Sequence, residues 1–166
     1  MKPVLVPRLA LVSIVAVAAA APTARADLPA HKFLPVAAAL TIAQGAYDAC
    51  IQQGHRVSVT VVGGEGQPIV AIRGDGASPH TLENSQRKAY TSRTFRVPSG
   101  DIAQRVKDNP GLGLVHLTGI VAIQGALPIK AGDEFVGAVG VSGAPGGEKD
   151  EACAKAGIDK IADQLK

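Results

Sequence analysis

The segment SQRKAYTSRTFR, residues 85–96, concentrates cations at helical spacing. Arg87, Tyr90 and Arg93 lie three residues apart and therefore share one stripe of a helix, while Lys88 points elsewhere. Guanidinium groups bind carboxylates in bidentate fashion, so this stripe could hold an organic acid. The alternative, which composition alone favours, is a solvated helix face.

A glycine-rich turn opens the segment VSGAPGGEKDEACAKAG, residues 141–157. Free N–H groups at the start of a helix attract anions. Here, however, Glu148, Asp150 and Glu151 stand in the turn, where they satisfy the helix dipole and would repel an anion. No Gly-Lys-Ser or Gly-Lys-Thr follows, so we interpret the segment as a strand-to-helix connection. Glu148 and Glu151 without a third ligand make a weak metal site.

The first 26 residues are typical of a secretory signal peptide. Two cations precede an apolar run from Leu9 to Ala21, and Ala24-Arg25-Ala26 provides a cleavage site before Asp27. The run is shorter than the roughly 20 residues that cross a bilayer. We therefore expect a single domain over residues 27–166, periplasmic or secreted, with no membrane span once the leader is removed.

Removal of the leader also changes the charge balance. Lys2, Arg8 and Arg25 are lost, so the 17 basic residues fall to 14, equal to the 14 acidic ones. The balanced charge gives no global indication of a nucleic-acid partner.

Cys50 and Cys153 are the only cysteines, one in the first predicted helix of the mature chain and one in the last. An oxidising compartment would allow them to pair. Such a disulfide closes a loop of about a hundred residues and is worth on the order of 4 kcal/mol in the chain-entropy model. The alternative is a pair of buried apolar thiols.

Hydrophobic periodicity predicts an α+β domain. Helices are expected over about residues 40–53, 79–95, 99–107 and 148–165, and strands over about 57–62, 68–72, 114–123, 127–129 and 134–141. The order is helix, two strands, two helices, two or three strands, helix. Short turns between the strands favour an antiparallel sheet of about five strands flanked by helices.

Several segments together resemble the GlcG/HbpS-like haem-binding family, which also includes the C-terminal domain of PduO-type proteins. The most specific is VGVSGAPGGEKDE, residues 139–151, and VTVV (59–62), PIV (68–70), RGDGA (73–77) and LPI (127–129) support it. The resemblance implies a small α+β domain, frequent homo-oligomers, and binding of haem or a related tetrapyrrole in several members.

Haem would need an apolar slot, an axial ligand and cations for its propionates. The candidate axial ligands are His31, His55, His80, His116, Tyr47, Tyr90 and the two cysteines. His80 is the first choice as the iron ligand, because it follows the Asp75-Gly76 turn and shares a helix with the basic cluster. His31 is the second, in an N-terminal tail that could fold over a pocket. Arg87, Tyr90 and Arg93 are then expected beside the propionates.

We expect the slot where the Asp75-Gly76 turn, the start of the His80 helix and the Leu127-Pro128-Ile129 strand meet. The predicted function is an exported haem (tetrapyrrole) binding protein that acts as carrier, buffer or sensor. The alternative is a small enzyme or accessory subunit that acts on a small organic acid through the arginine stripe. No GxSxG elbow supports a hydrolase.

Overall fold

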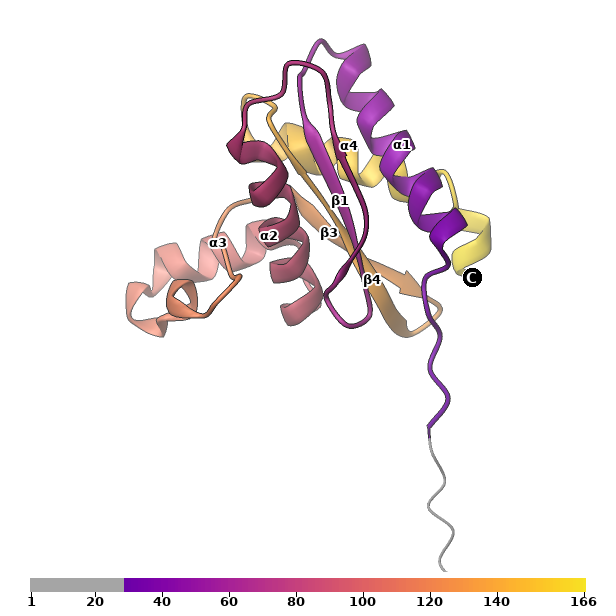
Figure 1. Ribbon diagram of the computed structural model, residues 1–166. Coiled ribbons are helices and arrows are strands. Elements are labelled where there is room, and N and C mark those ends of the chain that lie inside the picture. The colour runs from indigo at the N-terminus through magenta and orange to yellow at the C-terminus, as the bar shows by residue number, and fades with distance from the viewer. Residues whose placement is uncertain (1–28) are drawn as a thin grey trace, which may run out of the picture. The chain divides into compact units, whose positions relative to one another are not determined.

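The computed structural model describes residues 29–166, and the predicted signal peptide lies outside the described residues. Along the described chain the elements are α1 (Val36–Gln52), β1 (Ser58–Gly63), β2 (Pro68–Arg73), α2 (His80–Phe95), α3 (Ser99–Asp108), β3 (Ala126–Ala131), β4 (Glu134–Ser142) and α4 (Gly147–Asp159) (Figure 1). The described chain also contains three short 3-10 helices, η1 (Pro110–Leu112), η2 (Leu114–His116) and η3 (Ala162–Leu165). The predicted α+β class and element order are confirmed.

The four strands form one antiparallel sheet in the order β2-β1-β4-β3. The sheet has four strands rather than about five, because the segment expected as a strand over residues 114–123 does not pair. Gly113, just before this segment, and Gly119 within it adopt positive φ angles of 65° and 83°, which interrupt extended backbone. His116, expected on a strand, lies in η2 instead.

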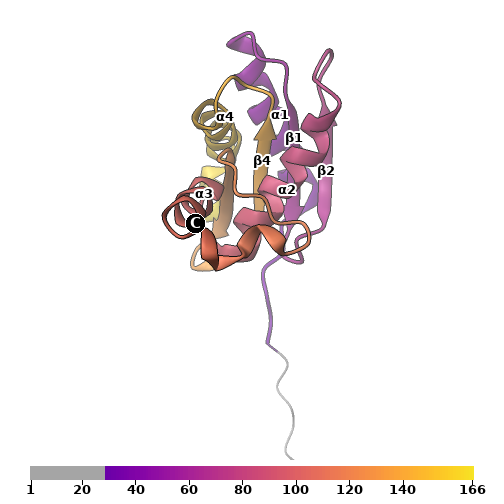
Figure 2. The same ribbon diagram turned by 90° about the vertical axis from the view of Figure 1, so that its left-hand side faces the viewer.

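The two faces of the sheet are covered differently (Figures 1 and 2). On one face α1 and α4 pack against Val59, Val61 and Val139 in the main apolar core. On the other face α2 packs on Ser58 and Thr60, whose hydroxyls bond to Thr81 and Ser85 of α2, each at 2.8 Å. Alternate residues of β1 thus serve an apolar layer and a polar, close-packed layer.

Gly140 of β4 shows how closely α2 approaches the sheet. A Cβ at this position would lie 2.2 Å from the Ser85 carbonyl oxygen, so only glycine fits beneath the helix. The contact fixes the line along which α2 crosses the sheet, and therefore where its two ends lie.

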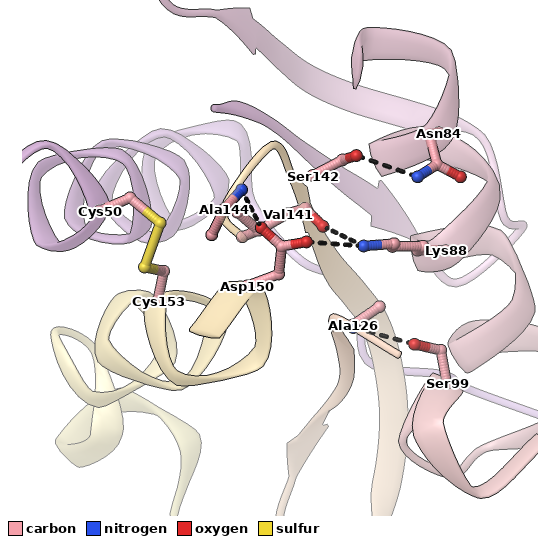
Figure 3. Close-up of polar contacts among 10 residues, drawn as sticks. All are labelled: Cys50, Asn84, Lys88, Ser99, Ala126, Val141, Ser142, Ala144, Asp150 and Cys153. Atoms are coloured by element: carbon pink, nitrogen blue, oxygen red, sulfur yellow. Dashed lines mark hydrogen bonds and ion pairs between the residues drawn. A yellow bond between two sulfur atoms is a disulfide. The ribbon is translucent and has the colours of Figure 1, made fainter. Parts of the chain in front are cut away.

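A disulfide joins Cys50 of α1 to Cys153 of α4, with a Cα–Cα distance of 5.5 Å (Figure 3). Both residues are fully buried. The predicted pairing is confirmed. It spans 103 residues, for which the chain-entropy model gives a stabilisation of about 4–5 kcal/mol.

Candidate ligand-binding site

Three cavities lie beside the N-terminal arm, which we define as residues 31–34, and the C-terminal end of α2 lines one of them. The cavity nearest α2 has a volume of about 450 Å³, and two others beside the arm have volumes of about 420 and 390 Å³. His31 and Lys32 line all three. We call the first the arm cavity; its other lining residues are Gly64, Glu65, Arg93, Arg96, Asp133, Glu134 and Phe135.

The arm is tied to the domain at three points. Leu34 is buried in the main core. The Lys32 backbone N–H donates to Glu134 Oε2 at 3.0 Å, and Lys32 Nζ donates to the Ala131 carbonyl at 3.0 Å. These contacts place the His31 imidazole beside the same carboxylate, with Nδ1 at 3.8 Å from Glu134 Oε2.

The cationic side of the arm cavity comes from the end of α2. Arg93 lies in the last turn of the helix, and its Nε atom is buried without a hydrogen-bond partner among the described residues. Arg96 ends α2 in the left-handed conformation, with φ 59°, and its guanidinium lies 5.7 Å from the centre of the Phe135 ring. A buried donor without a partner is costly, so Arg93 is suited to an anionic ligand.

Residues 34–159 match the family model described as "Haem degrading protein HbpS-like". The chain belongs to this family. A double glutamate-to-aspartate mutant of Streptomyces reticuli HbpS is 36% identical, with a TM-score of 0.76 over 85% of this chain and 97% of that one. An uncharacterised 15.0 kDa protein of Citrobacter freundii, from a dhaT-dhaS intergenic region, is 30% identical over 76% of this chain and 90% of its own.

More distant solved structures share the HbpS-like fold. Klebsiella pneumoniae protein ORFY is 24% identical, with a TM-score of 0.77 over 84% of this chain and 98% of that one. A PduOC:heme complex is 21% identical, with a TM-score of 0.72 over 78% of this chain and 96% of that one.

Of the residues predicted to bind haem in this HbpS-like chain, His31 and Arg93 line one cavity and His80 does not. His80 is the first residue of α2 and is exposed, whereas Arg93 is in the last turn. Thirteen residues of helix separate them by about 20 Å. The preferred histidine and Arg93 thus belong to opposite ends of the same helix.

The other two predicted residues on the stripe contact loops. The Arg87 guanidinium donates to the Ile120 carbonyl at 2.9 Å and lies 3.9 Å from Glu83. The Tyr90 ring packs between Gly66 and Gly119, where a Cβ on either glycine would come within about 3.1 Å of it. Arg87 and Tyr90 therefore anchor surface segments, and the arm cavity is reached only by Arg93 of this stripe.

The expected position of the slot is corrected by the sheet order. The Asp75-Gly76 turn follows β2 and the Leu127–Ile129 segment lies in β3, and these strands form opposite edges of the sheet. Gly76 instead faces the Arg56 side chain, with the nearest atom 3.1 Å from an added Cβ. Adjacent strands are about 4.8 Å apart, so two intervening strands keep these segments from meeting.

Sequence reasoning missed the buried ion pair between Lys88 and Asp150 (Figure 3). Lys88 Nζ donates to Asp150 Oδ2 at 2.8 Å and to the Val141 carbonyl at 3.0 Å. Asp150 Oδ1 accepts the Ala144 N–H at 3.0 Å. Burial raises the pKa of Asp150, and the bond and charge of Lys88 oppose that rise.

The Asp150 contacts bear on the glycine-rich turn before α4. The Asp150 carboxylate accepts a hydrogen bond from the Ala144 N–H of that turn. This contact supports the interpretation of the turn as a strand-to-helix connection. Gly125 leaves room for the pair, because a Cβ there would lie 2.7 Å from Lys88 Nζ. Gly125, directly before β3, is the one sequence feature that could have indicated close packing at this point.

Within residues 29–166, no three His, Cys, Asp or Glu side chains gather as a metal site. No helix of this part of the chain is long and apolar enough to cross a membrane.

Proposed function

We propose that this HbpS-like chain binds haem in the arm cavity, with His31 as the axial ligand and with Arg93 and Arg96 as partners of the propionates. The observation that carries the proposal is that a histidine of the arm and two arginines at the end of α2 line one cavity. The family description and the shared fold of the PduOC:heme complex support it.

The arm cavity offers the polar partners that haem needs, a histidine and two arginines, and Phe135 is its one apolar side chain. Imidazole is a common axial ligand of haem iron, and guanidinium groups pair with carboxylates. The unpartnered Nε of Arg93 is a donor ready for an anion. The cavities beside the arm add the apolar side chains of Leu34 and Ile69, and each has a volume in the range of about 300–1,000 Å³ typical of ligand sites.

Each element has a separate task in this proposal. Bound haem supplies an iron centre with redox and ligand-exchange chemistry. The arm presents the imidazole, the end of α2 presents the cations, and Phe135 offers an aromatic surface beside Arg96. Binding and orientation of this kind serve a carrier, buffer or sensor. The alternative, an enzyme acting on an organic acid through the arginine stripe, has less support because Arg87 and Tyr90 are engaged with loops.

The comparison of two histidine variants tests the proposal. We expect His31→Ala to weaken hemin binding at least tenfold and to abolish the shifted Soret band, because the iron loses its protein ligand. His80→Ala is the matched control and should bind like the wild type, because His80 lies at the other end of α2. Hemin titrations followed by absorbance measure both. Loss of binding in His80→Ala with retention in His31→Ala would contradict the proposal.

We also propose that the protein is exported and then forms a dimer or larger homo-oligomer. The signal-peptide pattern and the buried Cys50–Cys153 disulfide support export to the periplasm or the medium. Exposed Leu112, Val115 and Leu117 supply apolar surface for self-association. An intact mass that retains residues 1–26 would contradict export, and a monomeric mass by light scattering at micromolar concentration would contradict assembly.

A further inference from the structure

The end of α2 carries two arginines, Arg93 and Arg96, that line the arm cavity together. Within residues 29–166 neither of them forms an ion pair with a carboxylate. Arg93 Nε is also buried without a hydrogen-bond partner among these residues, whereas Arg87 on the same helix donates to the Ile120 carbonyl. Two guanidinium groups are therefore available at one place.

The rest of the lining suits a compact, polar ligand. Phe135 is the one apolar side chain in the described lining of the arm cavity. The Arg96 guanidinium lies 5.7 Å from the centre of its ring, and Lys130 Nζ lies 4.9 Å from it. The volume of about 450 Å³ is in the lower half of the range of about 300–1,000 Å³ for ligand sites. A ligand gains little here from apolar contact, so charge must provide the recognition.

Three carboxylates of the lining oppose an anion to different degrees. Glu134 accepts the Lys32 backbone N–H at 3.0 Å, so the arm compensates part of its charge. Glu65 and Asp133 are exposed, and salt screens exposed charges effectively. Arg93 is half-buried, so its charge is screened less. The cavity therefore keeps a cationic side at the end of α2.

We propose that the arm cavity binds a small dicarboxylate, with one carboxylate on the Arg93 guanidinium and the other on the Arg96 guanidinium. A guanidinium presents its N–H donors as a planar fork that fits the two oxygens of a carboxylate. Two such forks in one cavity favour a diacid over a monoacid. The inference does not rest on the proposed function, because it concerns the apoprotein and requires no iron.

Gly64, in the turn between β1 and β2, gives a way to fill the cavity without removal of a charge. A Cβ at this position would lie 4.0 Å from Arg93 Nη2 and 3.9 Å from the Val136 carbonyl oxygen, which is ordinary van der Waals contact. Gly64 does not adopt a positive φ angle, so its backbone tolerates a side chain. Gly64→Leu should therefore place apolar atoms beside the Arg93 guanidinium and exclude the diacid.

Titration of the apoprotein with succinate, followed by amide NMR shifts at low ionic strength, tests the proposal. We expect saturable shifts in the β1–β2 turn and at the end of α2, with butyrate about fivefold weaker because it lacks one ion pair. Arg93→Ala should weaken succinate binding by a similar factor. Arg93→Lys should also weaken it, because an ammonium group lacks the planar fork.

Two controls accompany these variants. Arg105→Ala removes an exposed cation of α3 outside the arm cavity, so it should change succinate affinity less than twofold. Circular dichroism and thermal unfolding verify that Arg93→Ala, Arg105→Ala and Gly64→Leu fold.

The possible results separate this inference from the proposed function. Absence of saturable succinate shifts in the wild type would overturn the inference, while hemin titration tests the proposed function independently. Equal losses in Arg93→Ala and Arg105→Ala would also overturn it, since they would reflect the overall charge. Full succinate affinity in Gly64→Leu, or equal affinity for butyrate and succinate, would overturn it as well. Saturating succinate should weaken hemin binding; if it does not, although succinate binds, the inference stands and the proposed haem site is wrong.

Discussion

Helix α2 takes part in two charged regions that differ in how completely their polar atoms are satisfied. In its middle, Lys88 meets Asp150, and their side chains are only 2% and 4% exposed (Figure 3). At its end, Arg93 lines a cavity opposite His31, whose side chain is 75% exposed. The Lys88 ammonium has two acceptors, whereas Arg93 Nε has none among the described residues. Satisfied charges hold the fold, and unsatisfied ones are available to a ligand.

The largest effect is expected from breaking the buried pair. Lys88→Ala leaves the Asp150 carboxylate buried without its cation, which typically costs about 3–5 kcal/mol in the free energy of unfolding. Urea denaturation of the oxidised apoprotein measures the loss. Lys149→Ala, an exposed lysine of the same turn as Asp150, is the control and should change stability by less than about 0.5 kcal/mol.

A second variant distinguishes the pair from simple loss of packing. Lys88→Met combined with Asp150→Leu removes both charges, so it should cost less than Lys88→Ala alone. A loss below 1 kcal/mol in Lys88→Ala would contradict the assignment of this pair to the stability of the fold.

The next effect concerns the two arginines of the stripe. Arg93→Ala should weaken hemin binding by up to about fivefold, since an ion pair at a partly exposed site is worth about 0–1 kcal/mol. Arg87→Ala is the matched control: it loses the bond to the Ile120 carbonyl and should lower thermal stability without a change in hemin affinity. If Arg87→Ala weakens hemin binding more than Arg93→Ala does, the ligand contacts Arg87 outside the arm cavity, and the proposed site is wrong.

Local features of the fold were predictable from the sequence, and the relative positions of distant segments were not. Periodicity located α1, β1, β2 and α4, and the cysteine positions predicted the disulfide. The strand order decides which loops meet, and nothing in the spacing of residues reports that order. The predicted slot therefore combines the Asp75-Gly76 turn, which follows β2, with the Leu127-Pro128-Ile129 segment of β3, although these two strands form opposite edges of the sheet.

The histidines and Lys88 illustrate the same limit at the level of side chains. Helical spacing correctly separated Lys88 from the stripe that carries Arg87 and Arg93. It did not indicate that the sheet and α4 cover the side of α2 on which Lys88 lies. His80 was preferred because it is close to the basic cluster along the chain. His31 is distant in sequence, and only the attachment of the arm to β4 brings it beside Arg93.

Glu151 shares features with both regions, and its replacement is expected to have the smallest effect on stability. Its Oε2 atom is buried and has no hydrogen-bond partner among the described residues. In this respect it resembles Arg93 Nε. Burial raises the pKa of Glu151 above its ordinary value of 4.5, Asp101 adds to the rise, and the Gln124 amide opposes it. Asp150 is paired with Lys88, whereas Glu151 has no lysine partner within residues 29–166 to compensate for its burial.

A raised pKa in the folded state fixes the sign of the pH effect. Between 4.5 and the folded pKa the native chain binds more protons than the unfolded chain, so the free energy of unfolding falls as pH rises. The cost of the ionised Glu151 is therefore fully present at neutral pH and absent well below 4.5. Glu151→Gln should accordingly stabilise the protein at pH 7 by less than about 1 kcal/mol, and the gain should disappear in acid.

Urea denaturation of Glu151→Gln and wild type at pH 7 and pH 4 measures this difference. Glu148→Gln makes the same charge change on the exposed side of the same helix, where loss of a favourable contact with the helix dipole gives no gain at neutral pH. A Glu151→Gln variant that is less stable than wild type at pH 7 would mean that the carboxylate has a favourable partner. Glu151 would then belong with the satisfied charges of the Lys88–Asp150 region.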